Sequence, residues 1–197
     1  MKVLRKIKIK AHELELMVND QIKVKLKDGR KYTLTAVQKQ EEGMLFVFDE
    51  CVDRKALVNE GDYVWKDCDL RKWLNNDFYS LLPKKFTDRL VLMPVDDDIH
   101  GDWLTLLTSE QLFGIDANGN DAEGQIEYFK SEKNRVAEFE GKTTWYWTKT
   151  PYASNSSLAR YVVTDGSLYS FTAYRGNGGV RPACLIRMCP KDTPQID

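Results

Sequence analysis

Cysteine and histidine are the residue types most often used for covalent or metal chemistry, and this chain has four cysteines and two histidines. No spacing among Cys51, Cys68, Cys184 and Cys189 matches the CxxC of a metal or redox site. We therefore expect buried free thiols. A nucleophile–base pair of Cys51 or Cys68 with His100 has no supporting local motif, and no GxSxG sequence is present. The sequence predicts no catalytic residue, no metal ligand set and no cofactor.

Two acidic segments offer oxygen ligands for a cation. The loop Asp116–Asp121, followed by Glu127, has a spacing similar to that of a calcium loop, but Asp121 occupies the sixth place, where such loops need glycine. Asp96–Asp98 is a run of three carboxylates. A solvated surface turn is the interpretation that we favour for both, and cation binding is the alternative.

Charge is balanced overall but uneven along the chain. The net charge of −1 gives no reason to expect nucleic acid as a partner. Residues 1–40 carry a net charge of +7 and residues 41–140 one of −12, which favours complementary solvated faces within one domain over a functional basic arm. No signal peptide or membrane-spanning run is visible, so we expect no membrane insertion and a cytoplasmic location, or a virion-associated one if a phage encodes the chain.

The hydrophobic pattern predicts an α+β domain. A hairpin is expected over 21–36 with its turn at Asp28-Gly29, and a central strand over 44–52. Helices are expected over 69–82, capped by Asp67 or Asp69 and ended by Pro83, over 109–113, and over 125–139. Further strands are expected at 89–95 and from Trp103. We divide the chain into a basic, strand-like segment (1–20), a single domain (21–190) and a tail (191–197).

Residues 144–188 predict a β-meander. Asp165-Gly166 between two strand-like runs is typical of a hairpin, and the glycine-rich segment 175–179 turns the chain into a third run, Val180–Met188. Alternation places Tyr169, Phe171 and Ala173 on one face of a strand and Ser170, Thr172 and Tyr174 on the other. Tyr, Ser, Asn and Gly are also the residues of antibody paratopes. The polar face therefore predicts a ligand-binding surface, with an ordinary exposed sheet as the alternative. Its candidate residues are Tyr152, Asn155, Ser157, Ser170, Thr172, Tyr174, Arg175 and Asn177.

Three segments carry a resemblance to a known family. They are VWKDCDLRKWLNNDFY (64–79), WLTLLTSEQLFG (103–114), and WYWTKTP (145–151) paired with GGVRPACLI (178–186). A QIEYFK…NR run over 125–135 matches as well. The chain resembles uncharacterised Firmicutes and prophage proteins that share a C-type-lectin-like domain ending in Gly-Val-Arg-Pro-Ala.

The resemblance implies a C-type-lectin-like fold with mixed or antiparallel sheets and two or three helices, related to formylglycine-generating enzymes and to phage receptor-binding proteins. Gly179-Val180-Arg181 corresponds to the closing motif of such folds, which implies structural roles for Trp145, Trp147 and Arg181. The paired catalytic cysteines of the related oxidase are missing, as are the calcium- and sugar-binding motifs of animal lectins. We expect a non-catalytic protein that recognises a protein or glycan through residues 152–177. An enzyme of unassigned class, or a structural part of a phage tail or secretion assembly, are the alternatives.

Overall fold

The first of two five-stranded sheets joins the beginning of the domain to its end. The computed structural model describes residues 16–95 and 98–188. All neighbouring strands of this sheet are antiparallel. In spatial order they are β1 (Gln21–Lys25), β2 (Lys31–Lys39), β3 (Gly43–Phe48), β14 (Ala183–Arg187) and β5 (Leu90–Val91).

The second five-stranded sheet contains the predicted meander. Its neighbours β10 and β13 are parallel, whereas its other pairs are antiparallel. In spatial order its strands are β12 (Leu168–Thr172), β11 (Leu158–Val162), β10 (Tyr146–Pro151), β13 (Gly178–Val180) and β4 (Asp53–Lys55). Two small hairpins complete the strands: β6 (Met93–Val95) with β7 (Asp98–Asp102), and β8 (Ala137–Phe139) with β9 (Lys142–Thr144).

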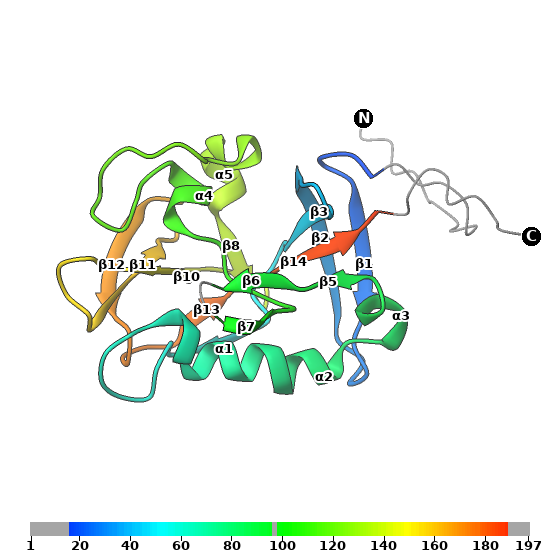
Figure 1. Cartoon of the computed structure of the whole chain (residues 1–197), viewed down its shortest axis with the longest axis horizontal. Coiled ribbons are helices and arrows are strands. Elements are labelled where there is room, and N and C mark those ends of the chain that lie inside the picture. The colour runs from blue at the N-terminus through cyan, green and yellow to red at the C-terminus, as the bar shows by residue number, and fades with distance from the viewer. Residues whose placement is uncertain (1–15, 96–97, 189–197) are drawn as a thin grey trace, which may run out of the picture.

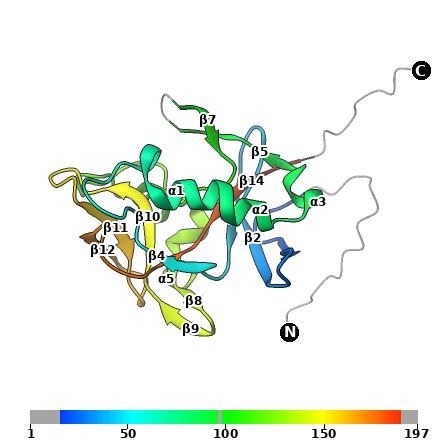
Figure 2. The same ribbon diagram turned by 90° about the horizontal axis from the view of Figure 1, so that it is seen from below.

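The helices are short, apart from one that runs along both sheets. That helix comprises α1 (Asp69–Trp73), a π-helical turn (Leu74–Phe78) and α2 (Tyr79–Leu81) without a break. Figure 1 shows the two sheets side by side with this helix beneath them, and Figure 2 places it in front of β14. The other α-helices are α3 (Lys84–Thr87), α4 (Ser109–Phe113) and α5 (Glu132–Arg135). The described chain is therefore α+β, as predicted, with more strand than helix.

One hydrophobic core spans both sheets. It joins Phe46 and Phe48 of β3 to Trp147 of β10 and Val180 of β13, and Leu74 of the long helix packs into it. A second cluster lies on the other side of these strands and includes Phe129, Tyr146 and Val162. Because the same strands contribute to both clusters, the two sheets are parts of one packed unit.

Several local predictions are confirmed. The hairpin of β1 and β2 turns at Asp28-Gly29, where Gly29 has φ 94°, a value that glycine adopts without strain. Strand β3 is buried along its whole length between β2 and β14. Helix α4 begins with a capping box of Thr108 and Gln111 and ends at Gly114.

The long helix begins and bends differently from the prediction. Its N-cap is Cys68, whose Sγ accepts a hydrogen bond from the backbone N–H of Arg71 at 3.3 Å, rather than Asp67 or Asp69. The carboxylate of Asp69 instead accepts from the N–H of Asn59. Within the π-helical turn, the Asn75 side chain donates to the carbonyl of Leu104 and accepts from the same residue's N–H. These bonds bring residues 103–104 against the helix.

Two predicted elements are wrong. Residues 103–107 form an isolated bridge from Thr105 to Ala183 rather than a strand, because the Trp103 and Leu104 N–H groups bond to Asn75. The predicted helix over 125–139 is a 3₁₀ turn (Glu127–Lys130), the short α5, and then strand β8. Gly141 lies in the β8–β9 turn with φ 73°.

The third run of the predicted meander is divided between the two sheets. Residues 178–180 form β13 in the second sheet, and residues 183–187 form β14 in the first. The break falls at Arg181-Pro182, where proline cannot donate a ladder hydrogen bond. The run predicted over Val180–Met188 is therefore not one strand, because the chain passes from β13 in the second sheet to β14 in the first.

The predicted boundaries are only partly covered by the described residues. Residues 16–20, at the end of the basic segment, form a turn, with the Asp20 N–H donating to the Met17 carbonyl at 3.0 Å. The remainder of the basic segment, together with Asp96, Asp97, Cys189 and the tail, lies outside the described residues.

Candidate ligand-binding surface

The register of β10, β11 and β12 places aromatic residues in line on one face of the second sheet. Tyr161 of β11 lies opposite both Trp147 of β10 and Tyr169 of β12. Phe171 lies opposite Ala159. Because residues that face each other across strands share a sheet face, one face carries aromatic side chains on all three strands.

Part of this face is open to solvent. Trp147 and Ala159 are buried, whereas Tyr169 is 60% exposed and Phe171 is 40% exposed. Trp145 and Tyr161 are partly buried beside them. The ring centroids of Trp145 and Tyr161 are 5.1 Å apart, and those of Tyr161 and Phe171 are 6.3 Å apart. We call Trp145, Tyr161, Tyr169 and Phe171 the aromatic surface.

Glycines in the predicted turn 175–179 support this surface. A Cβ at Gly178 would collide with the indoles of both Trp145 and Trp147, and one at Gly176 would press on the Trp145 ring at 3.2 Å. Gly176 also has φ 103°. The glycine-rich segment is therefore needed for the close approach of backbone to the two tryptophans.

Cationic and polar groups border the aromatic surface. The Arg54 side chain donates from Nε to the carbonyl of Asn177 at 2.7 Å. Arg175 is exposed, with its guanidinium 6.0 Å from the ring of Tyr174, which is 41% exposed. Neither arginine forms an ion pair with a carboxylate among the described residues. Both positive charges therefore remain available to a ligand.

The predicted site residues do not form one surface. Arg175 and Asn177 flank Gly176, which lies against the rings of Trp145 and Phe171, and Arg175 lies over the ring of Tyr174. Ser170 and Thr172 lie on the opposite face of β12 and are partly buried. The Ser170 Oγ is fully buried and has no hydrogen-bond partner. The expectation that the Ser170 face would be the open one is therefore wrong, because the protein packs against that face.

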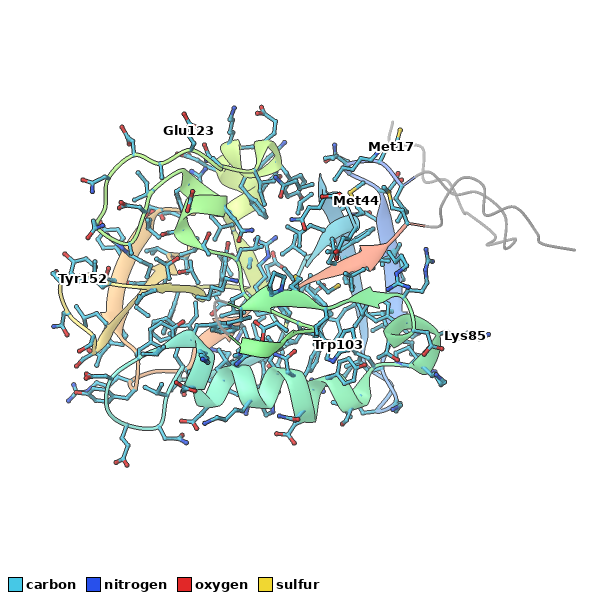
Figure 3. All side chains as sticks on the ribbon, in the orientation of Figure 1. Met17, Met44, Lys85, Trp103, Glu123 and Tyr152 are labelled. Carbon is cyan, nitrogen blue, oxygen red and sulfur yellow. The ribbon has the colours of Figure 1, made fainter. Side chains whose placement is uncertain are left out.

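The loop residues of the predicted site lie at the end of the sheet. Tyr152, labelled in Figure 3, has its ring 4.7 Å from the guanidinium of Arg160, which belongs to the face opposite the aromatic surface. The exposed Asn155 accepts from the backbone N–H of the partly buried Ser157 at 2.9 Å. Asn155 thus closes a turn of its own loop.

Tyr161 and Arg54 were not predicted as site residues. Ligand binding was predicted for the face of Ser170 and not for the face that carries Tyr169 and Phe171. Alternation correctly put Tyr169 and Phe171 together. Which face is covered depends on segments distant in sequence, such as the 116–120 loop, whose Ala117 carbonyl accepts from Arg160 on the Ser170 face at 3.4 Å. Arg54 reaches the border of the aromatic surface because β4 pairs with β13, a contact between residues more than 120 positions apart.

The residues predicted to be structural differ in exposure. Trp147 is buried, and its Nε1 donates to the Lys55 carbonyl at 2.9 Å, whereas Trp145 is only partly buried. Arg181 is buried and donates to the carbonyls of Phe48 and Asn134, which fits the structural role expected for it. It also lies over the Tyr146 ring. Arg181 therefore ties the crossing point of the two sheets to three neighbouring segments.

Burial makes the described thiols poor nucleophiles. Cys51, Cys68 and Cys184 are buried and free, which confirms the prediction for these three. Burial raises the pKa of Cys51 and of Cys68 to about 12 and raises that of Cys184 further. Since the thiolate is the reactive form, none of the three is activated.

The predicted polar turn at 116–121 is held by hydrogen bonds to the carboxylate of Asp116. Asp116 accepts from the backbone N–H of Asn120 at 2.9 Å and from the side chains of Asn118 and Asn120 at 3.4 Å. The Asn120 backbone bond is the main reason that the pKa of Asp116 is lowered. Within residues 16–95 and 98–188, no three His, Cys, Asp or Glu side chains gather as a metal site.

A cleft of about 370 Å³ lies between β10 and the loop that precedes the long helix. Tyr63, Trp65, Thr108, Glu110, Lys149 and Pro151 are among its lining residues. The Tyr63 hydroxyl donates to the Lys149 carbonyl, and the Lys149 Nζ lies 3.4 Å from the Thr105 Oγ1. No histidine or cysteine is among the described residues that line it.

Among the described helices, none has the length and apolar character needed to cross a bilayer.

Comparisons with known proteins identify one family. No curated protein and no solved structure is significantly similar to the chain. Residues 42–188 match the family described as Domain of unknown function (DUF6273). The matched region holds Trp145, Trp147, the rest of the aromatic surface and the sheet crossing. It excludes β1 and β2, although β2 pairs with β3 in the first sheet. The chain belongs to the DUF6273 family.

Proposed function

We propose that this protein is a non-catalytic recognition protein that binds a protein ligand through the aromatic surface. The observation that carries the proposal is the exposure of Tyr169 and Phe171 on a sheet face that also presents Trp145 and Tyr161. Neighbouring exposed aromatics on a folded domain mark interaction sites, since such surface is otherwise buried.

The composition of the site supports a protein ligand over a glycan. Aromatic residues and arginine are enriched at the centres of protein interfaces, and Arg54 and Arg175 stand beside the rings. The rings also do not lie flat. Trp145 meets Tyr161 at 69° and Phe171 at 73°. Edge-to-face rings present an uneven surface, which suits the side chains of a protein better than the flat face of a sugar ring.

The fold that we propose is C-type-lectin-like. The support is the resemblance of the three segments named above, together with the position of Gly179-Val180-Arg181 at the point where the chain crosses between the sheets. By the same resemblance we propose a prophage- or mobile-element-associated role. The described thiols are buried, which supports our proposal that this domain does not carry out the chemistry of the oxidases to which the resemblance points.

A surface-protein and glycan binding screen tests this function. The full chain is screened, and the hit is measured again with the double variant Tyr169→Ala/Phe171→Ala. Two aromatic residues at the centre of an interface contribute about 3 kcal/mol or more together, so we expect binding to weaken by about 100-fold or more.

Thr172→Ala is the matched control, because Thr172 is on the same strand but on the opposite face. It should bind like the unmodified chain. Equal binding by the double variant and the unmodified chain would show that the aromatic surface is not the binding site. Hits confined to glycans would show that a protein is the wrong class of ligand.

A further inference from the structure

Strand β12 is the outer strand of the second sheet, and one of its backbone edges is open. It pairs with β11 over five consecutive residues without a bulge. Hydrogen bonds from Val163 to Ser167 and from Ala173 to Ser157 fix which residues face β11. Because hydrogen-bonded pairs alternate along an antiparallel ladder, the N–H and C=O groups of Leu168 and Ser170 point away from β11, to the open edge.

The other outer strands of the two sheets are protected in ways that β12 is not. Strand β1 exposes Lys23 and Lys25, β5 has only two residues, and β4 has three residues, all of them charged. Exposed lysines and short length are the usual means by which proteins prevent pairing of sheet edges. Strand β12 is five residues long, carries no charge and no proline, and exposes Tyr169 and Phe171.

We propose that β12 is a dimerisation strand, which pairs antiparallel with β12 of a second copy of this chain, with Ser170 on the two-fold axis. A strand is the chemical complement of an open strand edge, since it alone satisfies the alternating donors and acceptors. A second copy is the occupant that the sequence of β12 fits, because the strand is complementary to itself in this register.

The register follows from the outward-facing residues. With Ser170 opposite Ser170 of the second copy, Leu168 pairs with Thr172, and both pairs are at hydrogen-bonded positions. The Thr172 carbonyl also accepts from the Arg175 N–H of its own chain at 3.1 Å. Tyr169 then lies opposite Phe171 of the second copy at the closer, non-hydrogen-bonded position. Aromatic pairs at such positions stabilise a sheet, and no like charges face each other across the axis.

The dimer would place both aromatic surfaces on the same side of a continuous sheet. A two-fold axis normal to the sheet relates the copies, so equivalent faces point the same way. The proposed dimer does not depend on ligand binding, and its tests are carried out without ligand.

The first test is the oligomeric state of the full chain, measured by sedimentation over a wide range of concentration. We expect the unmodified chain to associate reversibly to a dimer and Tyr169→Lys to remain a monomer at every concentration. Met17→Lys is the matched control, because Met17 is 64% exposed, close to the 60% of Tyr169, and lies outside β12. It should dimerise like the unmodified chain.

The second test reports the register. Tyr169→Cys and Phe171→Cys are prepared separately and oxidised alone and as a mixture. In the proposed register the two substituted positions face each other only across different variants, at a separation that a disulfide can span. We expect a cross-linked dimer in the mixture and none above the background of the unmodified chain in either variant alone.

Two results would overturn the dimer. One is that the unmodified chain stays a monomer at all concentrations. This result would overturn the dimer even if a peptide from another protein were found to pair with the open edge of β12. The other is a dimer that Tyr169→Lys leaves intact and that forms no cross-link in the mixture, because association would then involve another surface.

Discussion

The two five-stranded sheets have equal numbers of strands but different borders. The outer strands β1 and β12 are both five residues long, and each pairs with one antiparallel neighbour. At its exposed positions β1 carries Gln21, Lys23 and Lys25, whereas β12 carries Tyr169 and Phe171. Charge at the border of the first sheet disfavours pairing with a further strand, whereas the border of the second sheet carries no charge and exposes two aromatic rings.

The glycines that support each sheet should differ in the cost of adding a methyl group. At Gly178 in the second sheet, a Cβ would meet two indoles, whereas Gly29 in the first sheet has φ 94° and open space around it. We expect Gly178→Ala to lower the free energy of unfolding by about 3 kcal/mol through overpacking and Gly29→Ala to lower it by about 1 kcal/mol through backbone strain. Urea denaturation measures both. Equal losses would mean that the indoles move aside easily.

Removing the lysines of β1 should make the first border resemble the second. Lys23 and Lys25 are exposed on β1 and form no ion pair among the described residues. We expect Lys23→Thr/Lys25→Thr to increase self-association by about tenfold while leaving stability nearly unchanged. Sedimentation of the double variant, compared with Lys84→Thr on α3, measures the change. Unaltered association would show that charge is not what protects β1.

The partly buried face of β12 should tolerate the loss of the Ser170 hydroxyl. Ser170 Oγ is buried without a partner, so Ser170→Ala removes an uncompensated polar atom and should raise the free energy of unfolding by about 1 kcal/mol. Thr148→Ala is the matched control, because the buried Thr148 Oγ1 donates to the Arg160 carbonyl at 3.0 Å. It should lower stability by about 1 kcal/mol. A loss with Ser170→Ala would point to an unseen hydrogen bond.

Local signals predicted the parts of the fold that short segments determine. The Asp28-Gly29 and Asp165-Gly166 turns and the capped α4 are correct because turn and cap chemistry acts over a few residues. The helix expected over 125–139 failed because Ile126 and Phe129, which have helical spacing, are buried from a 3₁₀ turn instead. Tertiary packing decided that segment.

The candidate site was only half predictable. Alternation assigned Tyr169 and Phe171 to one face and Ser170 to the other, but no local feature tells which face the rest of the chain will cover. The division of residues 178–187 between two sheets depends on Pro182 and on the bonds of Arg181 to Phe48 and Asn134. Those partners are distant in sequence, and a single chain gives no direct sign of them.

The most direct test of ligand recognition maps the contact of the best-binding protein from the screen by NMR chemical-shift perturbation on the full chain. We expect the largest changes to fall on Tyr161, Tyr169 and Phe171 and on the neighbouring Arg175. Changes concentrated on the cleft residues Thr108, Glu110 and Lys149, with the aromatic surface unaffected, would contradict it.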